Sequence, residues 1–250
     1  MGFWAVIGAG WRGTFGAIKA NPWPFVALLL GVVVLKALLH LADPVHYVQS
    51  LSRTADPVMV SSMTAVHQVA RGAVFYLFFS LIATPCMVAV HRHMLLEEDR
   101  RIWENPQRLV VFAIFFFSMR FVLFSLPSLL TVLSHWFGLI YIVSLWLVVR
   151  LALTFPAAAL DDSTPLASSW RYTSEHWFFA AGVMLFGLGP VTLMSVPFSI
   201  AIIHATPETA IRLYNALTVA TTVSGLFYAT VGAGLAAELF RKFGNAPVIG

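Results

Sequence analysis

Long stretches without a charged residue constrain this chain more than any other feature. The 250 residues are 59% hydrophobic and only 10% charged, whereas soluble domains carry about 25% charged residues. The mean hydropathy is +0.83. This composition excludes an ordinary water-soluble enzyme, a disulfide scaffold and a disordered chain, and it predicts an integral membrane protein. The charge-free stretches run from Lys19 to Lys36, from Arg71 to Arg92, from Glu175 to Glu208 and from Arg212 to Glu238.

The lengths of the apolar runs predict six transmembrane helices. Between Arg108 and Asp161 only Arg120 and Arg150 are charged, and this segment is long enough for two spans joined by a turn. We therefore expect an all-α integral membrane protein, with residues 1–250 in a single polytopic domain. The runs do not alternate in polarity, which excludes a transmembrane β-barrel. A break at the membrane surface between the two spans is expected at His135, Trp136 and Gly138. The expected spans lie near residues 24–42, 72–94, 109–133, 136–159, 177–204 and 213–240.

The distribution of lysine and arginine predicts the orientation in the membrane. Cytoplasmic loops of membrane proteins carry an excess of these residues. With the N-terminus inside, the three residues Arg53, Arg71 and Arg212 fall outside. The expected cytoplasmic set has nine members, Arg12, Lys19, Arg92, Arg100, Arg101, Arg108, Arg171, Arg241 and Lys242. We therefore expect a multi-pass protein with both termini in the cytoplasm.

Residues 1–20 are expected to form an interfacial amphipathic helix before the first span. Apolar residues recur every three or four positions, and Arg12 and Lys19 lie on the other face. Such a helix lies in the membrane surface more readily than across it. It is either a sensor of the lipid surface or a plain anchor leading into the span at Asn21–Pro22, and the sequence favours the anchor. The expected apolar face consists of Trp4, Ile7, Trp11, Phe15 and Ile18.

A search for catalytic patterns is negative. The sequence lacks GxxxxGK, HExxH, CxxC and GxSxG motifs. His91 and His93 flank Arg92, but residues two apart on a helix point in different directions and do not share one metal ion. We interpret both histidines as interfacial residues that end the second span. We expect no enzyme activity, no metal and no cofactor.

Arg120 and Arg150 are the candidate binding residues. Each lies 15 residues from His135, so an antiparallel hairpin that turns there places both at the same depth. That depth is roughly 22 Å from the turn, in the inner leaflet of a core about 30 Å thick. No Asp or Glu occupies the spans at this level. The two arginines either extend individually to lipid phosphates or share one anionic ligand, most simply a phospholipid head group.

Two further segments indicate packing and anchoring. Residues 161–177 are expected to form an interfacial helix anchored by Trp170 and Trp177, in addition to Trp4 and Trp11 near the N-terminus. One face of this helix is expected to hold Leu166, Trp170, Thr173 and Trp177. The last span carries small residues every four positions, which favours close packing inside the molecule over homodimerisation. These small residues are Gly225, Ala229, Ala233 and Ala237, with Gly232 and Ala236 beside them.

A short pattern resembles a bacterial membrane family. It combines Arg150–Leu151–Ala152–Leu153, Pro156, Ser169–Trp170, Thr173 and Trp177, and residues 90–97 resemble the inner end of a helix in related proteins. The pattern is similar to that of the YciC-like inner-membrane proteins and of the membrane-anchor domain of some glycerophosphodiester phosphodiesterases. The resemblance implies a multi-pass inner-membrane domain, and it brings no catalytic domain with it.

Two functional hypotheses follow. The first is a non-enzymatic protein that organises the membrane or binds a partner and contacts anionic lipid. The alternative is a small transporter or permease component for an anionic or amphiphilic solute. Transport predicts an acidic site at mid-depth, and the absence of Asp and Glu there favours the first hypothesis. Membrane lipids are the expected partners and nucleic acid is not. The identity of a protein partner and the formation of a homo-oligomer stay open.

The orientation can be tested by fusing reporters to the C-terminus in a bacterial host. A fluorescent protein should be bright there and alkaline phosphatase inactive, because the nine-to-three distribution of basic residues places this end in the cytoplasm. Active phosphatase with a dark fluorescent protein would contradict the topology.

Overall fold

The computed structural model describes residues 2–42, 62–96, 106–121, 139–160, 164–193, 197 and 207–243. These residues form helices and turns with no strand among them, which confirms the all-α class. The helices are α1 (Phe3–Ala20), α2 (Trp23–Ala42), α4 (Ser62–Leu96), α5 (Pro106–Arg120), α7 (Leu139–Leu151), α8 (Thr154–Ala159), α9 (Pro165–Thr173), α10 (Trp177–Leu193) and α12 (Pro207–Phe243).

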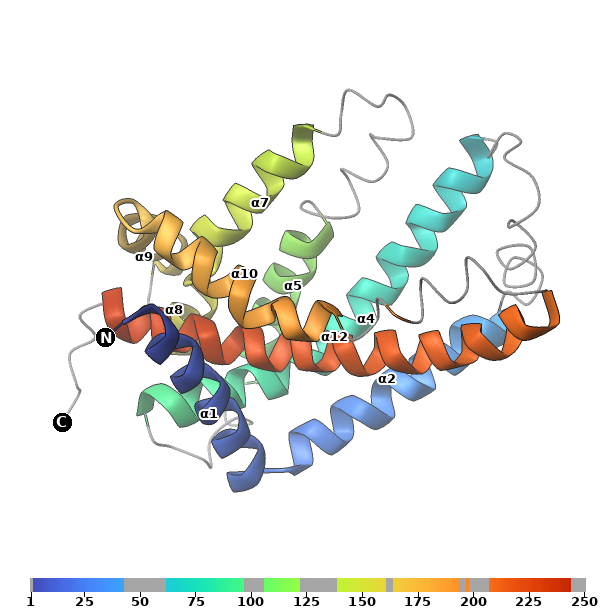
Figure 1. Ribbon diagram of the computed structural model, residues 1–250, viewed down its shortest axis with the longest axis horizontal. Helices are drawn as coiled ribbons and strands as arrows, with labels where there is room; N and C mark the ends of the chain where they lie inside the picture. Colours follow the sequence, from blue (N-terminus) through green and yellow to red (C-terminus); the bar gives the residue numbers. More distant parts are fainter. Residues whose placement is uncertain are drawn as a thin grey trace.

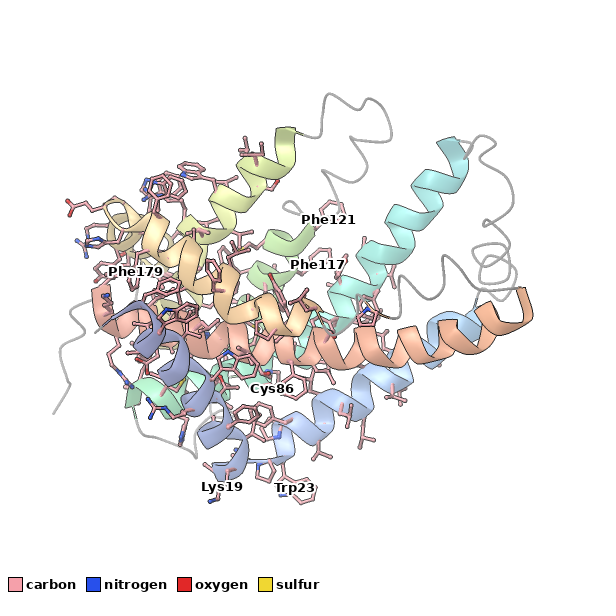
Figure 2. The ribbon with its side chains drawn as sticks, in the orientation of Figure 1. Lys19, Trp23, Cys86, Phe117, Phe121 and Phe179 are labelled. Atoms are coloured by element: carbon pink, nitrogen blue, oxygen red, sulfur yellow. The ribbon has the colours of Figure 1, made fainter. Side chains whose placement is uncertain are left out.

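Two long helices organise the bundle. α12 packs against α1, α4 and α10, and α4 also packs against α2 and α5. In Figure 1, α12 crosses the middle of the molecule while α7 and α4 rise from it on one side and α2 extends along the other. Buried residues form two clusters, one around α4 and α2 and the other around α12, α10 and α7. Cys86 of α4 belongs to the first cluster and its thiol donates a hydrogen bond to the Pro24 carbonyl, 2.8 Å away (Figure 2).

The first two helices meet in a sharp bend. The axes of Phe3–Ala20 and Trp23–Leu35 differ in direction by 93°. Asn21 stands between them with φ −140° and ψ 86°. A residue that precedes proline is driven out of the helical region by the proline ring, so Asn21–Pro22 ends the first helix. The expected helix at the N-terminus and its end are therefore confirmed.

The buried face of α1 differs from the expected one. Ile7 is buried, but Trp4 is 70% exposed and Phe15 is 49% exposed. The buried positions instead form a mostly small-residue face, Val6, Ile7, Gly10, Thr14 and Ala17. This face lies against α12, α4 and α10, because small side chains let the helix backbones approach closely. The expected apolar face is therefore divided: Trp4 and Phe15 point outwards, whereas Ile7 and Trp11 pack on the protein.

The contact between α1 and α12 depends on two glycines. A Cβ atom on Gly234 would lie 2.6 Å from the Gly10 carbonyl oxygen and would also overlap Thr14 Oγ1. The Thr14 hydroxyl donates a 2.8 Å hydrogen bond to the same carbonyl. A Cβ atom on Gly10 would lie 3.1 Å from the Leu235 Cα atom. Backbone therefore meets backbone at this crossing, with no space for a larger side chain.

Several helix boundaries differ from the expected spans. The helix expected over residues 136–159 is interrupted at Ala152–Leu153, which form a turn between α7 and α8. α12 and α4 are longer than expected, at 37 and 35 residues. Among the described residues, Ala73–Leu96 and Ile142–Ala159 are long and apolar enough to cross a membrane, and the bent pair α1–α2 adds a third candidate. The apolar segments Leu109–Met119 and Trp177–Val191 are shorter. The second halves of the spans expected at 109–133 and 177–204 lie largely outside the described residues.

The crossing of α1 and α12 can be tested with single alanine substitutions. Gly234→Ala should lower the free energy of unfolding in detergent by about 1–3 kcal/mol, since overpacking a close contact displaces the backbone. Gly8→Ala in α1 and Gly225→Ala in α12 are matched controls, because a Cβ atom at either position meets nothing within 4 Å. Both controls should leave stability unchanged or raise it by up to about 1 kcal/mol, the helix propensity of alanine over glycine. Equal effects at all three positions would contradict the close crossing.

Candidate functional site

The residues of the short pattern that resembles the membrane family come together at the end of α7. Arg150 lies in the last turn of this helix, where the final carbonyl groups have no partner within the helix. The Ser169 hydroxyl donates to the Arg150 carbonyl oxygen at 2.7 Å. The single proton of the Thr173 hydroxyl has two carbonyl oxygens within reach, that of Ser169 at 2.8 Å and that of Arg150 at 3.2 Å. Both hydroxyls come from α9, so this helix is fastened to the end of α7 by two polar contacts.

The sequence of α9 explains why its polar face is turned inwards. The helix starts with Pro165, whose fixed φ angle suits the first helical position. Its buried residues are Ser168, Ser169 and Thr173. Leu166 and Trp170 are 48% and 43% exposed, whereas Thr173 is buried. The face that was expected to hold all three residues is therefore divided between the surface and the interior. The hydroxyls face inwards because the unpaired carbonyl at the end of α7 requires donors.

The Arg150 side chain lies against two tryptophans. Its Cζ atom is 4.2 Å from the ring centroid of Trp170 and 5.8 Å from that of Trp146. The two rings are perpendicular to each other, with their centroids 5.4 Å apart. Such cation–π contacts contribute roughly 0.5–2 kcal/mol, depending on how far the pair is removed from water. The side chain is 6% exposed and its buried Nε atom has no hydrogen-bond partner. The aromatic rings therefore fix the guanidinium while leaving hydrogen-bonding capacity unused.

The second candidate arginine lies at the end of α5. Arg120 is the last residue of that helix, and its side chain lies outside the described part of the chain, as do His135 and the expected turn. α5 packs mainly on α4. A ligand shared by Arg120 and Arg150 therefore stays a prediction.

The four expected tryptophan anchors have different surroundings. Trp4 and Trp170 are largely exposed, while Trp11 is half-buried and donates from Nε1 to the Gly187 carbonyl at 3.1 Å. Trp177 is half-buried and stacks on Phe178, with 3.7 Å between the ring centroids. Sequence analysis missed Trp23, which is 76% exposed at the start of α2 and points away from the bundle (Figure 2). The rule that places tryptophan at membrane surfaces applies equally to this residue.

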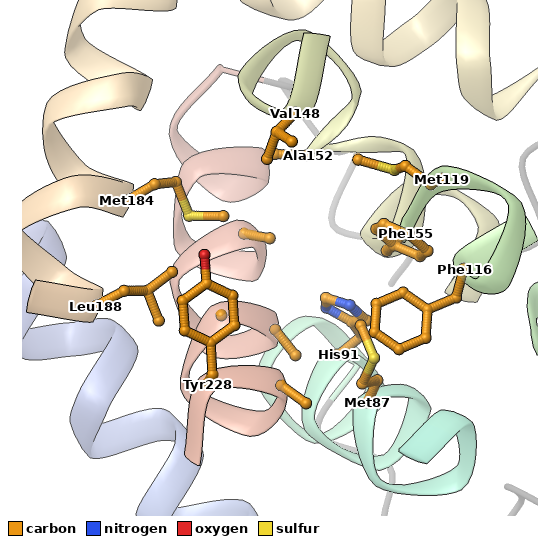
Figure 3. Close-up of a pocket in the computed structure, with 14 residues that line it drawn as sticks. Met87, His91, Phe116, Met119, Val148, Ala152, Phe155, Met184, Leu188 and Tyr228 are labelled. Atoms are coloured by element: carbon orange, nitrogen blue, oxygen red, sulfur yellow. The ribbon is translucent and has the colours of Figure 1, made fainter. Parts of the chain in front are cut away.

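A cavity of about 90 Å³ lies where α4, α5, α7, α8, α10 and α12 converge (Figure 3). Its wall is apolar apart from His91 and Tyr228. Ala229, Gly232, Ala233 and Ala236 form the α12 side of the wall. The small-residue face of the last span therefore packs inside the molecule, as expected, and it also leaves a space.

His91 is the functional candidate that sequence analysis missed. The side chain is fully buried inside the protein, which the sequence did not indicate, while its expected depth at the membrane surface stays a prediction. Neither ring nitrogen has a hydrogen-bond partner. His91 and Met87 line the cavity one helical turn apart, and this spacing is the only sequence signal that could have linked them. In the described residues, no group of three or more His, Cys, Asp or Glu side chains could hold a metal ion.

Comparisons with known proteins give no match: no protein-family model, curated protein or solved structure is similar to this chain.

The attachment of α9 to α7 can be tested by removing its two hydroxyls. Ser169→Ala and Thr173→Val should each lower the free energy of unfolding by about 0.5–1.5 kcal/mol, the net value of one hydrogen bond. The double variant should lose more than the sum, because either remaining hydroxyl still serves the Arg150 carbonyl in the single variants. Ser174→Ala is the control, since this exposed hydroxyl bonds only within its own turn, to Arg171. Thermal denaturation in detergent measures all four variants, and strictly additive losses would contradict the shared acceptor.

Proposed function

We propose that this protein is a multi-pass helical protein of the bacterial inner membrane that binds anionic lipid in the cytoplasmic leaflet. It acts without catalysing a reaction and organises lipid, or a protein partner, at that surface. Six helices cross the membrane, α1 lies in the cytoplasmic surface and both termini are cytoplasmic. The short pattern around Arg150 relates it to the YciC-like proteins.

The direction of the helices supports this topology. α2 and α10 lead away from the part of the bundle where α1 lies, and α4, α7 and α12 run towards it (Figure 1). An up-and-down arrangement of this kind is what alternating spans require. The longest helices, α4 and α12, exceed the roughly 20 residues that a span needs.

Basic side chains are found on the elements that meet at this part of the bundle. α1 carries Arg12 and Lys19, both exposed, and Lys19 points away from the protein (Figure 2). Arg171 of α9 and Arg241 of α12 are also exposed. Near an anionic membrane surface each such residue contributes about 1 kcal/mol of attraction. Exposed Trp4 and Phe15 stand on α1 together with Arg12 and Lys19, and exposed Trp23 follows at the start of α2, a combination typical of a surface-bound segment.

The environment of Arg150 carries the proposal. A cation that only extends towards lipid phosphate needs no fixed position, whereas this guanidinium is buried and held by Trp146 and Trp170. Among the described residues the ion pair is formed by Glu238 and Arg241, and no acid is paired with Arg150. A fixed guanidinium with a free donor suits a phosphate group, which accepts planar, two-point hydrogen bonds.

Arg120 completes the site in this proposal. Its position in the sequence predicts a depth equal to that of Arg150, and one phosphate between the two guanidiniums would compensate the positive charge of both. In the competing account each arginine contacts lipid independently.

The proposal predicts how lysine substitutions change lipid binding. Arg150→Lys should weaken binding of phosphatidylglycerol about tenfold, because an ammonium group loses both the two-point hydrogen bonding and the planar contact with Trp170. Arg120→Lys should weaken it similarly, and the double variant should be little worse than either single one. Brominated phosphatidylglycerol, titrated into protein in nanodiscs, reports binding by quenching tryptophan fluorescence.

The matched control is Arg171→Lys, an exposed arginine next to Trp170 on the same helix. It should leave the affinity unchanged within about twofold, as expected for an exposed charge. Zwitterionic phosphatidylcholine and soluble glycerol phosphate serve as ligand controls. Equal binding of phosphatidylcholine, or equal small losses in all three arginine variants, would overturn the site and leave only general attraction to anionic surfaces.

A further inference from the structure

The cavity beside His91 is separate from the proposed lipid site. Arg150 does not line it, although Val148 and Ala152 on either side of this arginine do. One water molecule needs roughly 10–15 Å³ of such space, so a cavity of about 90 Å³ has room for a larger guest. The space stays unfilled because the residues on the α12 side of the wall are small, among them Ala229, Gly232 and Ala233.

His91 places a polar group with unused hydrogen bonds in this apolar space. The ring is fully buried and both nitrogens lack a partner. A buried polar group without a partner destabilises the fold, so native structures rarely leave one unsatisfied. In Figure 3 the His91 ring lies at the wall of the cavity, facing the space between Phe116 and Tyr228. The unpartnered His91 ring therefore destabilises the empty cavity, and a guest that hydrogen-bonds to the ring would remove this effect.

The wall determines what kind of guest fits. Among the residues that line the cavity none is charged, which excludes an ionic guest. The polar residues in the wall are His91 and Tyr228. Two is the smallest number of polar partners that one buried water molecule needs, so the wall is too apolar to hold a cluster of water molecules. A neutral imidazole has one donor and one acceptor, and a hydroxyl group complements either. An apolar molecule with one hydroxyl group pairs with one of the two His91 nitrogens and fills the remaining space with carbon.

The open side of the cavity indicates how such a molecule enters. His91 is completely buried, whereas five other wall residues are partly exposed, namely Met119, Val148, Met184, Tyr228 and Gly232. In Figure 3 the side chains of Met119, Val148 and Met184 are spread along the upper edge of the cavity, and His91 lies below them. Two of these three are methionines, whose flexible side chains adapt to the shape of a guest. The open side is apolar, which suits delivery from a lipid phase.

We propose that this cavity binds an uncharged, membrane-soluble molecule that enters with a hydroxyl group first and hydrogen-bonds to His91. The proposal does not depend on lipid binding at Arg150, since the two sites share no side chain. The ligand class is a phenol or a lipophilic alcohol.

The test compares two probes that differ in one hydroxyl group, 4-ethylphenol and ethylbenzene. The full chain in detergent micelles is titrated with each, and binding is followed by the ¹⁵N signals of its histidine rings. The phenol should bind about tenfold more tightly, which corresponds to one net hydrogen bond in a buried site. It should also shift the signal of His91, whereas ethylbenzene leaves that nitrogen without a partner.

Variants separate the hydrogen bond from the cavity. His91→Phe keeps a ring of similar size and should bind both probes equally and weakly. His93→Phe is the matched control on the same helix and should keep the preference for the phenol. Ala233→Leu fills the cavity from α12 and should abolish binding of both probes, which covers the case in which His91→Phe does not fold. Equal affinity of the two probes in the unsubstituted protein, or binding of neither, would overturn the proposal.

Discussion

The close packing of α12 against its neighbours is the interaction on which the rest of the bundle depends. Within a membrane the hydrophobic effect does not drive helices together, so contact between closely packed atoms must do so. The missing side chain of Gly234 lets α1 approach until Thr14 and the Gly10 carbonyl occupy its place. The neighbouring Leu235 fills the space over Gly10 and Gly187, so one leucine on α12 contacts both α1 and α10. These contacts fix the relative positions of the helices that carry the site around Arg150 and the cavity beside His91.

The same choice of small residues has the opposite effect on another face of α12. Where α1 lies directly against the helix, Gly234 produces a tight fit. Where α5, α7 and α10 approach, Ala229, Gly232, Ala233 and Ala236 are too short to reach them, and a space remains. Close packing and a cavity therefore follow from one sequence property. The distance of the facing helix decides between them, and the composition of α12 alone does not reveal that distance.

Local sequence rules predicted the helices better than their contacts. Asn21–Pro22 ends α1 because proline restricts the residue before it, and this effect involves only neighbouring residues. The inward face of α1 could not be predicted in this way, because a hydrophobicity pattern ranks Trp4 above Gly10 while close packing reverses the order. The residues of the pattern from Arg150 to Thr173 lie together in the fold, but the pattern did not show that two hydroxyls contact one carbonyl. His91 was missed because its burial depends on helices far away in the sequence.

Arg150 holds α9 in two independent ways at once. Its main-chain carbonyl contacts the hydroxyls of Ser169 and Thr173, and its side chain lies on the ring of Trp170 between them. A movement that separates α9 from α7 breaks the polar and the aromatic contacts together, so a partly separated α9 keeps neither kind of contact. The attachment therefore has an attached and a detached state, and we call it the α7–α9 latch. α9 leads through the turn at residues 174–176 directly into α10, which supplies Met184 and Leu188 to the cavity wall. Opening this latch would therefore release one wall of the cavity, and a guest that holds the wall in place would keep the latch shut.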